Sequence, residues 1–281
     1  MEAPAGIRKH WVENERRSHG LGRLTILRTC SPPSDERCPL VSVAKNLSPE
    51  DLELYGATDP RDQPWYTYPE VARATEIPVS TLRAWTVGQR YRRKEGRGFF
   101  RPVIDRPSDA DPRLSFTNLI EAHVLRALRT VHEVQLAYIR EALEVAEEEF
   151  GIERLLISPQ LRTSAGQLFL DRYTELLELS KGKQLVMREV LGEYVERVRF
   201  DETRMPIEFH PFSRMPSKTT RDLISLSPYV AFGRAVIRRL GVSTQAVVQR
   251  LEAGEPVDEV MQDYELSPQE VQEAILYEAA A

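Results

Sequence analysis

Cationic side chains gather in one short stretch of an otherwise acidic chain. Between residues 77 and 104 the only acid is Glu95, whereas the basic residues are Arg83, Arg90, Arg92, Arg93, Lys94, Arg97 and Arg101. The 281-residue chain as a whole has a formal net charge of −5. A cationic island in an acidic protein indicates a polyanionic partner, for which the phosphates of nucleic acid are the usual choice. The alternative is a solvated hairpin whose basic residues only keep it soluble.

The elements that would position these cations are two short helices joined by a turn. The first is predicted over 69–75, and Pro78 prevents it from continuing. Ser80 is a suitable N-cap for a second helix over 81–87, which Gly88 can end. A turn of about four residues between two helices is the helix-turn-helix spacing.

In such a unit the first turns of the second helix meet the base edges of DNA. Ser80, Thr81 and Arg83 occupy those turns. An arginine can bridge guanine O6 and N7 or hold a phosphate, and the sequence leaves both roles open. Leu82 and Trp85 share a helix face and are expected to pack the unit rather than touch DNA.

A basic ribbon follows the second helix. Arg90, Arg92, Arg93, Lys94, Arg97 and Arg101 surround Gly96 and Gly98, which we expect at the tip of a hairpin. The stretch Phe99–Ile104 closes the ribbon. We interpret it as a β-wing that follows the phosphate backbone.

The stretch 66–116 resembles the MerR-like winged helix-turn-helix at the N-terminus of one class of VapB-type antitoxins. The resemblance continues through LSFTNLIEAHVLRALR (114–129) and nearly reaches the C-terminus, so only the first 60 or so residues fall outside it. It implies an antitoxin of a type II toxin–antitoxin system. Such a protein binds operator DNA, represses its own operon and neutralises a PIN-domain toxin, which is a metal-dependent ribonuclease.

Four segments are expected, and together they form a mainly α fold with a small β component (α+β). The stretches 31–39 and 57–64 are rich in proline and acid, and residues 1–60 read as a largely disordered extension. The six basic residues among the first 28 leave a DNA-binding arm as the alternative. The winged helix-turn-helix domain takes 61–153. A small mixed α/β middle module, serving as a spacer or a dimer contact, takes 154–217, and a three-helix domain similar to a helix-turn-helix takes 218–281.

Two further helices are predicted inside the second segment. From Ser115 onward, apolar residues recur at helical spacing as far as Val131. After a break near His132, a second stripe runs from Leu136 to Ala146. The glutamates of this second helix face away from the stripe, which is typical of a solvated face rather than a catalytic one.

The last segment resembles a small helical domain that recurs in the same antitoxins. The matching stretches are 227–228, 233–237, 242–244, 253–255, 257–264 and 266–268. Arg238–Gly241 is shorter than the family's segment, and Ala235 stands where the family has proline. Helices are expected over 256–264 and 268–280, with Ser267 capping the last one and Glu270 at capping-box spacing. The expected core residues are Val257, Val260, Met261, Tyr264, Leu266, Val271, Ala274 and Ile275.

Nine acids and no Lys or Arg follow Arg250. Phosphate would repel these carboxylates, so we expect a protein partner here, or else a purely structural or dimerising bundle. Acidic helices suit the basic RNA-binding surface of a nuclease toxin. The expected contact residues are Glu255, Asp258, Glu259, Asp263, Glu270 and Glu273.

Other functions are disfavoured by the sequence. No nucleophile–base arrangement or phosphate-binding loop stands out, so we expect neither an enzyme nor a cofactor. Cys30 and Cys38 lack companions at metal-ligand spacing, so no metal site is expected. The absence of a long apolar run and of a signal peptide predicts a cytoplasmic protein without membrane contact. DNA half-site geometry favours a homodimer. The alternatives are a MerR-like transcription regulator without a toxin, with or without a small ligand, and a structural protein that binds no DNA.

Overall fold

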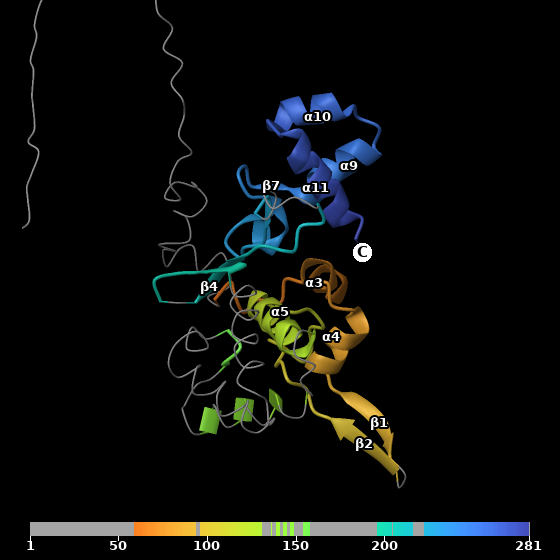
Figure 1. Ribbon diagram of the computed structural model, residues 1–281, viewed down its shortest axis with the longest axis vertical. Coiled ribbons are helices and arrows are strands. Elements are labelled where there is room, and N and C mark those ends of the chain that lie inside the picture. Colours follow the sequence, from red (N-terminus) through yellow and green to blue (C-terminus); the bar gives the residue numbers. More distant parts are fainter. Residues whose placement is uncertain are drawn as a thin grey trace, which may run out of the picture. The chain divides into compact units, whose positions relative to one another are not determined.

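The structure of the protein is a computed structural model, shown in Figure 1. The residues that it describes all fall within the larger of two compact units, 38–281. They are 59–93, 96–130, 136, 139–140, 143–144, 147–148, 154–157, 196–203, 205–215 and 222–280. The expectations for residues 1–58, for the break near His132 and for most of the middle module (158–195) lie outside the described residues.

The helix-turn-helix forms where the sequence predicts it. Helix α3 spans Tyr68–Thr75, and it begins with a complete capping box between Thr67 and Glu70. Its C-cap, Glu76, adopts a left-handed conformation with φ 55°. Helix α4 spans Val79–Thr86. The connection between the two helices is therefore three residues long. The left-handed conformation of Glu76 ends α3 and turns the chain sharply toward α4.

The predicted cap of α4 is wrong. Pro78 is the N-cap of this helix, and no side chain caps it, while Ser80 lies within the first turn. The physical reason is that the restricted φ of proline suits a helix entry, so the helix begins at Val79. The carbonyl of Pro78 accepts hydrogen bonds from the backbone N–H groups of Thr81 and Leu82, at 2.9 and 3.1 Å. Gly88, with φ +87°, follows the helix end as expected.

The predicted wing is a two-stranded antiparallel hairpin. Strand β1 spans Gln89–Arg93 and strand β2 spans Gly96–Phe100. Gly96 lies at the tip, paired with Arg93, but Gly98 lies inside β2, paired with Tyr91. A Cβ at Gly98 would come within 2.3 Å of the Tyr91 ring. This glycine therefore makes room for an aromatic side chain and does not form the turn.

A long helix supports the helix-turn-helix. Helix α5 spans Phe116–Thr130, in agreement with the apolar periodicity from Ser115. Farther along the chain Ile139 is buried, while Leu136 and Leu143 are half-buried. Glu144 and Glu148 are exposed, as expected for a solvated face.

Short strands link the middle of the chain to its C-terminal part. Strands β3 (Val198–Phe200) and β4 (Pro206–Phe209) pair antiparallel across a turn at residues 202–203. A bridge between Phe209 and Leu226 connects β4 to the residue after strand β5. Strands β5 (Ile224–Ser225), β6 (Val236–Ile237) and β7 (Val242–Ser243) form an antiparallel sheet in that order. The sequence predicts no strands in this last segment, because two-residue strands leave no alternating pattern.

The C-terminal helices follow this sheet (Figure 1). Helix α9 spans Thr244–Glu252, α10 spans Val257–Tyr264 and α11 spans Pro268–Glu278. Ser267 and Glu270 form the expected capping box at the start of α11. Two of the predicted core residues are wrong: Val257 is 48% exposed and Ile275 is 40% exposed. Both side chains lie on the exposed faces of their helices, although their apolar residue type alone suggested the core.

Two hydrophobic cores organise the described residues. The smaller joins Ile237 to the C-terminal helices through Val247, Val260, Leu266, Val271 and Ala274. The larger contains Leu82 and Trp85 of the helix-turn-helix, and it also contains Phe209 and Leu226. The helix-turn-helix therefore shares its core with residues of the predicted middle and C-terminal segments, whose exact boundaries stay predictions. The α+β class expected from the sequence is confirmed.

Candidate nucleic-acid interface

Helix α4 is held by its buried face and presents its other face to solvent. Leu82 and Trp85 are buried, as predicted. Thr86 donates to the carbonyl of Leu82 at 2.9 Å, and its hydroxyl lies 2.7 Å from the hydroxyl of Tyr68 on α3. These contacts fix the rotation of α4 about its axis, which decides the side chains that it exposes.

The exposed face carries two of the three predicted base-contacting residues. Ser80 and Arg83 are exposed, while Thr81 is half-buried. The guanidinium of Arg83 lies 5.3 Å from the centre of the Tyr68 ring. A cation over an aromatic face is attracted to it, so the ring orients this arginine without neutralising its charge.

The sharp turn between α3 and α4 is stabilised from α5. Arg126 donates to the carbonyl of Thr75 at 2.7 Å and to the carboxylate of Glu76 at 2.9 Å. The same guanidinium stacks over the ring of Phe212, 4.9 Å from its centre. Sequence reasoning missed this positioning residue, because its partners Thr75 and Glu76 lie 51 and 50 positions away in the sequence.

The wing is joined rigidly to α4. The backbone N–H groups of Val103 and Ile104 both donate to the carbonyl of Trp85, at 2.7 and 3.1 Å. At the same end of the hairpin, Gly88 approaches the carbonyl of Phe100 so closely that a Cβ would lie 2.4 Å from it. The hairpin thus follows directly from α4, as Figure 1 shows.

The wing presents cations together with an aromatic side chain. The register places Arg90 opposite Phe99. Arg90 and Arg92 are exposed, and Phe99 is 54% exposed. On the other face Tyr91 stacks on Phe100, with ring centres 4.1 Å apart, and Arg140 lies over Phe100 at 5.6 Å.

Of the remaining predicted wing residues, the structure describes the side chain of one, Arg101. Arg101 is exposed just after β2, and its carbonyl accepts a hydrogen bond from Arg140. The side chains of Arg93 and Arg97, and the whole of Lys94, lie outside the described residues. The structure therefore brings Ser80, Arg83, Arg90 and Arg92 onto two directly connected elements.

The predicted acidic contact surface is smaller than the sequence suggested. Glu270 and Glu273 are 4% and 3% exposed, so they are wrong as partner contacts. Burial opposes ionisation of Glu270, but hydrogen bonds from Arg239 and from Ser267 lower the pKa of this carboxyl. Glu273 accepts from the backbone N–H of Arg214 at 3.1 Å. Both carboxylates hold the fold together.

Two further acids of this set are already paired. Arg250 donates to Glu255 and also to Asp263, the latter at 2.7 Å. Arg250, the last basic residue of the sequence, therefore neutralises two of the nine acids that follow it. Asp258 and Glu259, in the first turn of α10, are exposed and lie beside the exposed Val257.

Two negative findings apply to the described residues alone. No helix among them is long and apolar enough to cross a membrane. Within the same residues, no cluster of three or more His, Cys, Asp or Glu side chains is arranged to hold a metal ion.

Two family models match separate parts of the chain. Residues 64–143, which contain the helix-turn-helix and the wing, match a family described as "Putative DNA-binding HTH domain". Residues 224–277, which contain the C-terminal sheet and helices, match a "Protein of unknown function (DUF433)". The first match agrees with the geometry of α3 and α4.

The chain also resembles known proteins over most of its length. It is 26% identical over 230 residues to "Putative antitoxin VapB45" of Mycobacterium tuberculosis (strain ATCC 25618 / H37Rv), covering 76% of this chain and 93% of that protein. It also resembles the crystal structure of Rv2018 from Mycobacterium tuberculosis, with a TM-score of 0.58 and 24% identity. That match covers 76% of this chain and 98% of the other, and it shows a shared fold.

Proposed function

We propose that the helix-turn-helix and its wing bind operator DNA in the MerR-like manner. Helix α4 would enter the major groove with Ser80 and Arg83, and β1 would follow the phosphates with Arg90 and Arg92. The observation that carries this proposal is the exposure of three arginines on two connected elements of an acidic chain. None of the three forms an ion pair with another described residue, so their charges are available to phosphate.

The second part of the proposal is that the protein is an antitoxin of a type II toxin–antitoxin system. Its support is the likeness to a protein named as an antitoxin, which spans 93% of that protein's length. The toxin would be a PIN-domain ribonuclease. It would dock on the exposed first turn of α10, where Val257 offers an apolar contact and Asp258 and Glu259 offer charges complementary to an RNA-binding surface.

We also propose a homodimer as the DNA-binding form. A repressor that reads two half-sites needs two recognition helices, and a two-fold axis in the protein matches the two-fold symmetry of such an operator.

The test uses the full chain together with the product of the neighbouring gene. We expect co-purification of the two proteins, inhibition of RNA cleavage in the complex, and tighter binding to DNA from the operon's own promoter than to scrambled DNA. The double variant Asp258→Lys/Glu259→Lys should lose inhibition and keep DNA binding. Glu147→Lys/Glu148→Lys, which changes two adjacent exposed acids elsewhere in the chain, is the matched control. Full inhibition by the first variant would move the toxin contact away from α10.

A MerR-like regulator without a toxin partner is the alternative. The same experiment separates the two, because that regulator would bind promoter DNA while the neighbouring gene product neither co-purifies with it nor cleaves RNA.

A further inference from the structure

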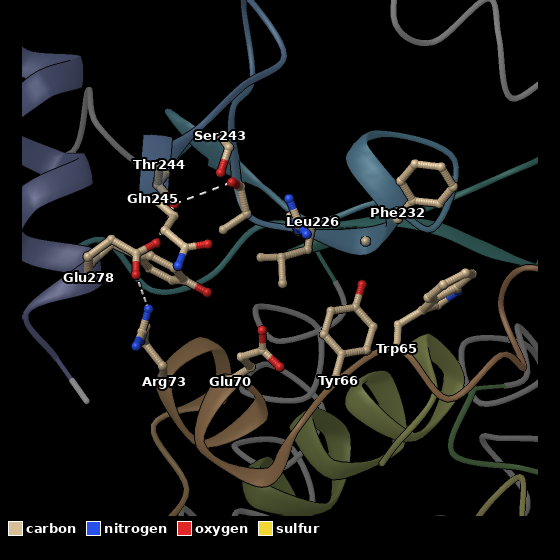
Figure 2. A pocket seen from close by; sticks show the side chains of 14 residues that line it. Trp65, Tyr66, Glu70, Arg73, Leu226, Phe232, Ser243, Thr244, Gln245 and Glu278 are labelled. Carbon is tan, nitrogen blue, oxygen red and sulfur yellow. Dashed lines mark hydrogen bonds and ion pairs between the residues drawn. The ribbon is translucent and has the colours of Figure 1, made fainter. Parts of the chain in front are cut away.

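A pocket of about 150 Å³ lies where the segment that leads into α3 meets the C-terminal part of the chain. Figure 2 shows its lining. Trp65, Tyr66, Glu70 and Arg73 come from the first side, and the residues of the other side include 232–235, 243–245 and 277–278. Neither family description nor the DNA-binding surface accounts for this pocket.

The phenol of Tyr66 is the first sign that the pocket receives a ligand. Its side chain is only 3% exposed, and its hydroxyl makes no hydrogen bond within the described part of the chain. A buried hydroxyl without a partner is costly, so native structures rarely keep one without a purpose. Gly233 adjoins it: a Cβ at this position would lie 2.5 Å from the hydroxyl oxygen. Burial raises the pKa of Tyr66 well above its usual range, which keeps the phenol protonated and able to donate.

The rim of the pocket is an exposed aromatic side chain on a strained backbone. Ala231 and Phe232 both adopt left-handed conformations, with φ of 49° and 55°. The Phe232 side chain is 55% exposed, and its ring centre lies 5.9 Å from that of Trp65. Strained non-glycine backbone is typical of ligand clamps and switch regions. Here the strain holds an apolar ring at the pocket mouth instead of burying it.

The charges of the lining define the kind of ligand. Glu278 pairs with Arg73, as Figure 2 shows, and it accepts a hydrogen bond from Thr244 at 2.5 Å. Glu70 accepts from the backbone N–H and the hydroxyl of Thr67, each at 2.7 Å. Both lining carboxylates are therefore already engaged. Arg234 is exposed and forms no ion pair with another described residue. The lining therefore offers a ligand the cation of Arg234 and the phenolic donor of Tyr66.

We propose that this pocket binds a small carboxylate with an apolar body, about the size of benzoate. The carboxylate would pair with Arg234 and accept a hydrogen bond from Tyr66, while the apolar body would contact Phe232 and Trp65. The size fits, because a cavity of roughly 150 Å³ holds one benzene ring. The charge fits as well, since an arginine is the residue that best matches a carboxylate.

The pocket adjoins the helix-turn-helix, because Glu70 and Arg73 are residues of α3 and Tyr66 lies two positions before that helix. The ligand site itself does not depend on the proposed antitoxin function.

The test is calorimetric titration of the full chain with benzoate in the absence of DNA. We expect saturable binding with a Kd on the order of 1 mM. Benzyl alcohol, which keeps the ring but lacks the charge, and acetate, which lacks the ring, should each bind at least about tenfold more weakly.

Two variants assign the binding to this pocket. Arg234→Gln and Tyr66→Phe should each weaken benzoate binding by about tenfold. Arg90→Gln, which removes an exposed arginine from the wing, is the matched control and should leave binding unchanged. Absence of saturable binding, or equal affinity of all three variants and the original chain, would overturn the proposal. Because no DNA is present, this outcome is independent of whether the helix-turn-helix binds an operator.

Discussion

The wing offers the sharpest test of DNA binding, because its charge can be removed without touching the core. Arg90 and Arg92 are exposed on β1. Each phosphate contact contributes about 0.9 to the slope of log K against log salt, so Arg90→Ala/Arg92→Ala should reduce the slope by about 1.8. If the variant and the original chain bind DNA equally at about 1 M salt, this difference in slope makes the variant's affinity roughly 60-fold lower at about 0.1 M salt.

The assay is fluorescence anisotropy with labelled duplex DNA over a series of salt concentrations. The loss should be equal for promoter and scrambled DNA, because phosphate contacts carry no sequence information. Arg113→Ala/Arg129→Ala, which removes two exposed arginines outside the wing and α4, is the control. If both double variants change the slope by the same amount, the effect comes from net charge alone, and the reasoning about the wing is refuted.

Three further predictions concern recognition and stability. Arg83→Ala should reduce the preference for promoter DNA over scrambled DNA by about 1–3 kcal/mol, measured by competition, if it contacts a base; equal losses on both DNAs would make it a phosphate contact. Ser267→Ala removes a capping box, so it should lower the free energy of unfolding by about 1 kcal/mol in urea titrations. Ser80→Ala removes no cap and is the control, which should change the free energy of unfolding by less than about 0.5 kcal/mol. Burial lowers the pKa of His210 below its ordinary value of 6.5. Just below pH 6.5 the histidine is therefore protonated in the unfolded chain but still neutral in the native protein. Stability should therefore fall as the pH decreases below about 6.5, and a His210→Gln variant should show a flatter decline; an unchanged pH profile would contradict this.

Local patterns predicted the local elements of the fold. Proline and glycine mark the ends of α3 and α4, and the Ser267 capping box needs only residues three positions apart. The helix-turn-helix and wing therefore follow from the sequence between Thr67 and Phe100. The predicted Ser80 cap failed because two residues competed to start one helix, and the backbone of Pro78 decided the outcome.

Contacts between distant residues could not be predicted in the same way. Arg250 pairs with Asp263, and Arg73 of α3 pairs with Glu278 of α11, across 205 positions of the sequence. No spacing rule relates such residues. For the same reason the burial of Glu273 was missed: a carboxylate that satisfies the backbone N–H of Arg214 looks in the sequence like any solvated acid.

The shared core has a consequence for how the protein is made. Leu226 and Phe209 are almost completely buried in the core that also holds Leu82 and Trp85. A chain that is synthesised from its N-terminus acquires the residues of the helix-turn-helix first, but this core closes only after residue 226 has left the ribosome. The core that contains Leu82 and Trp85 is therefore completed late in translation, when most of the chain already exists. A ribosome that stops before residue 226 releases a product in which this core lacks Leu226.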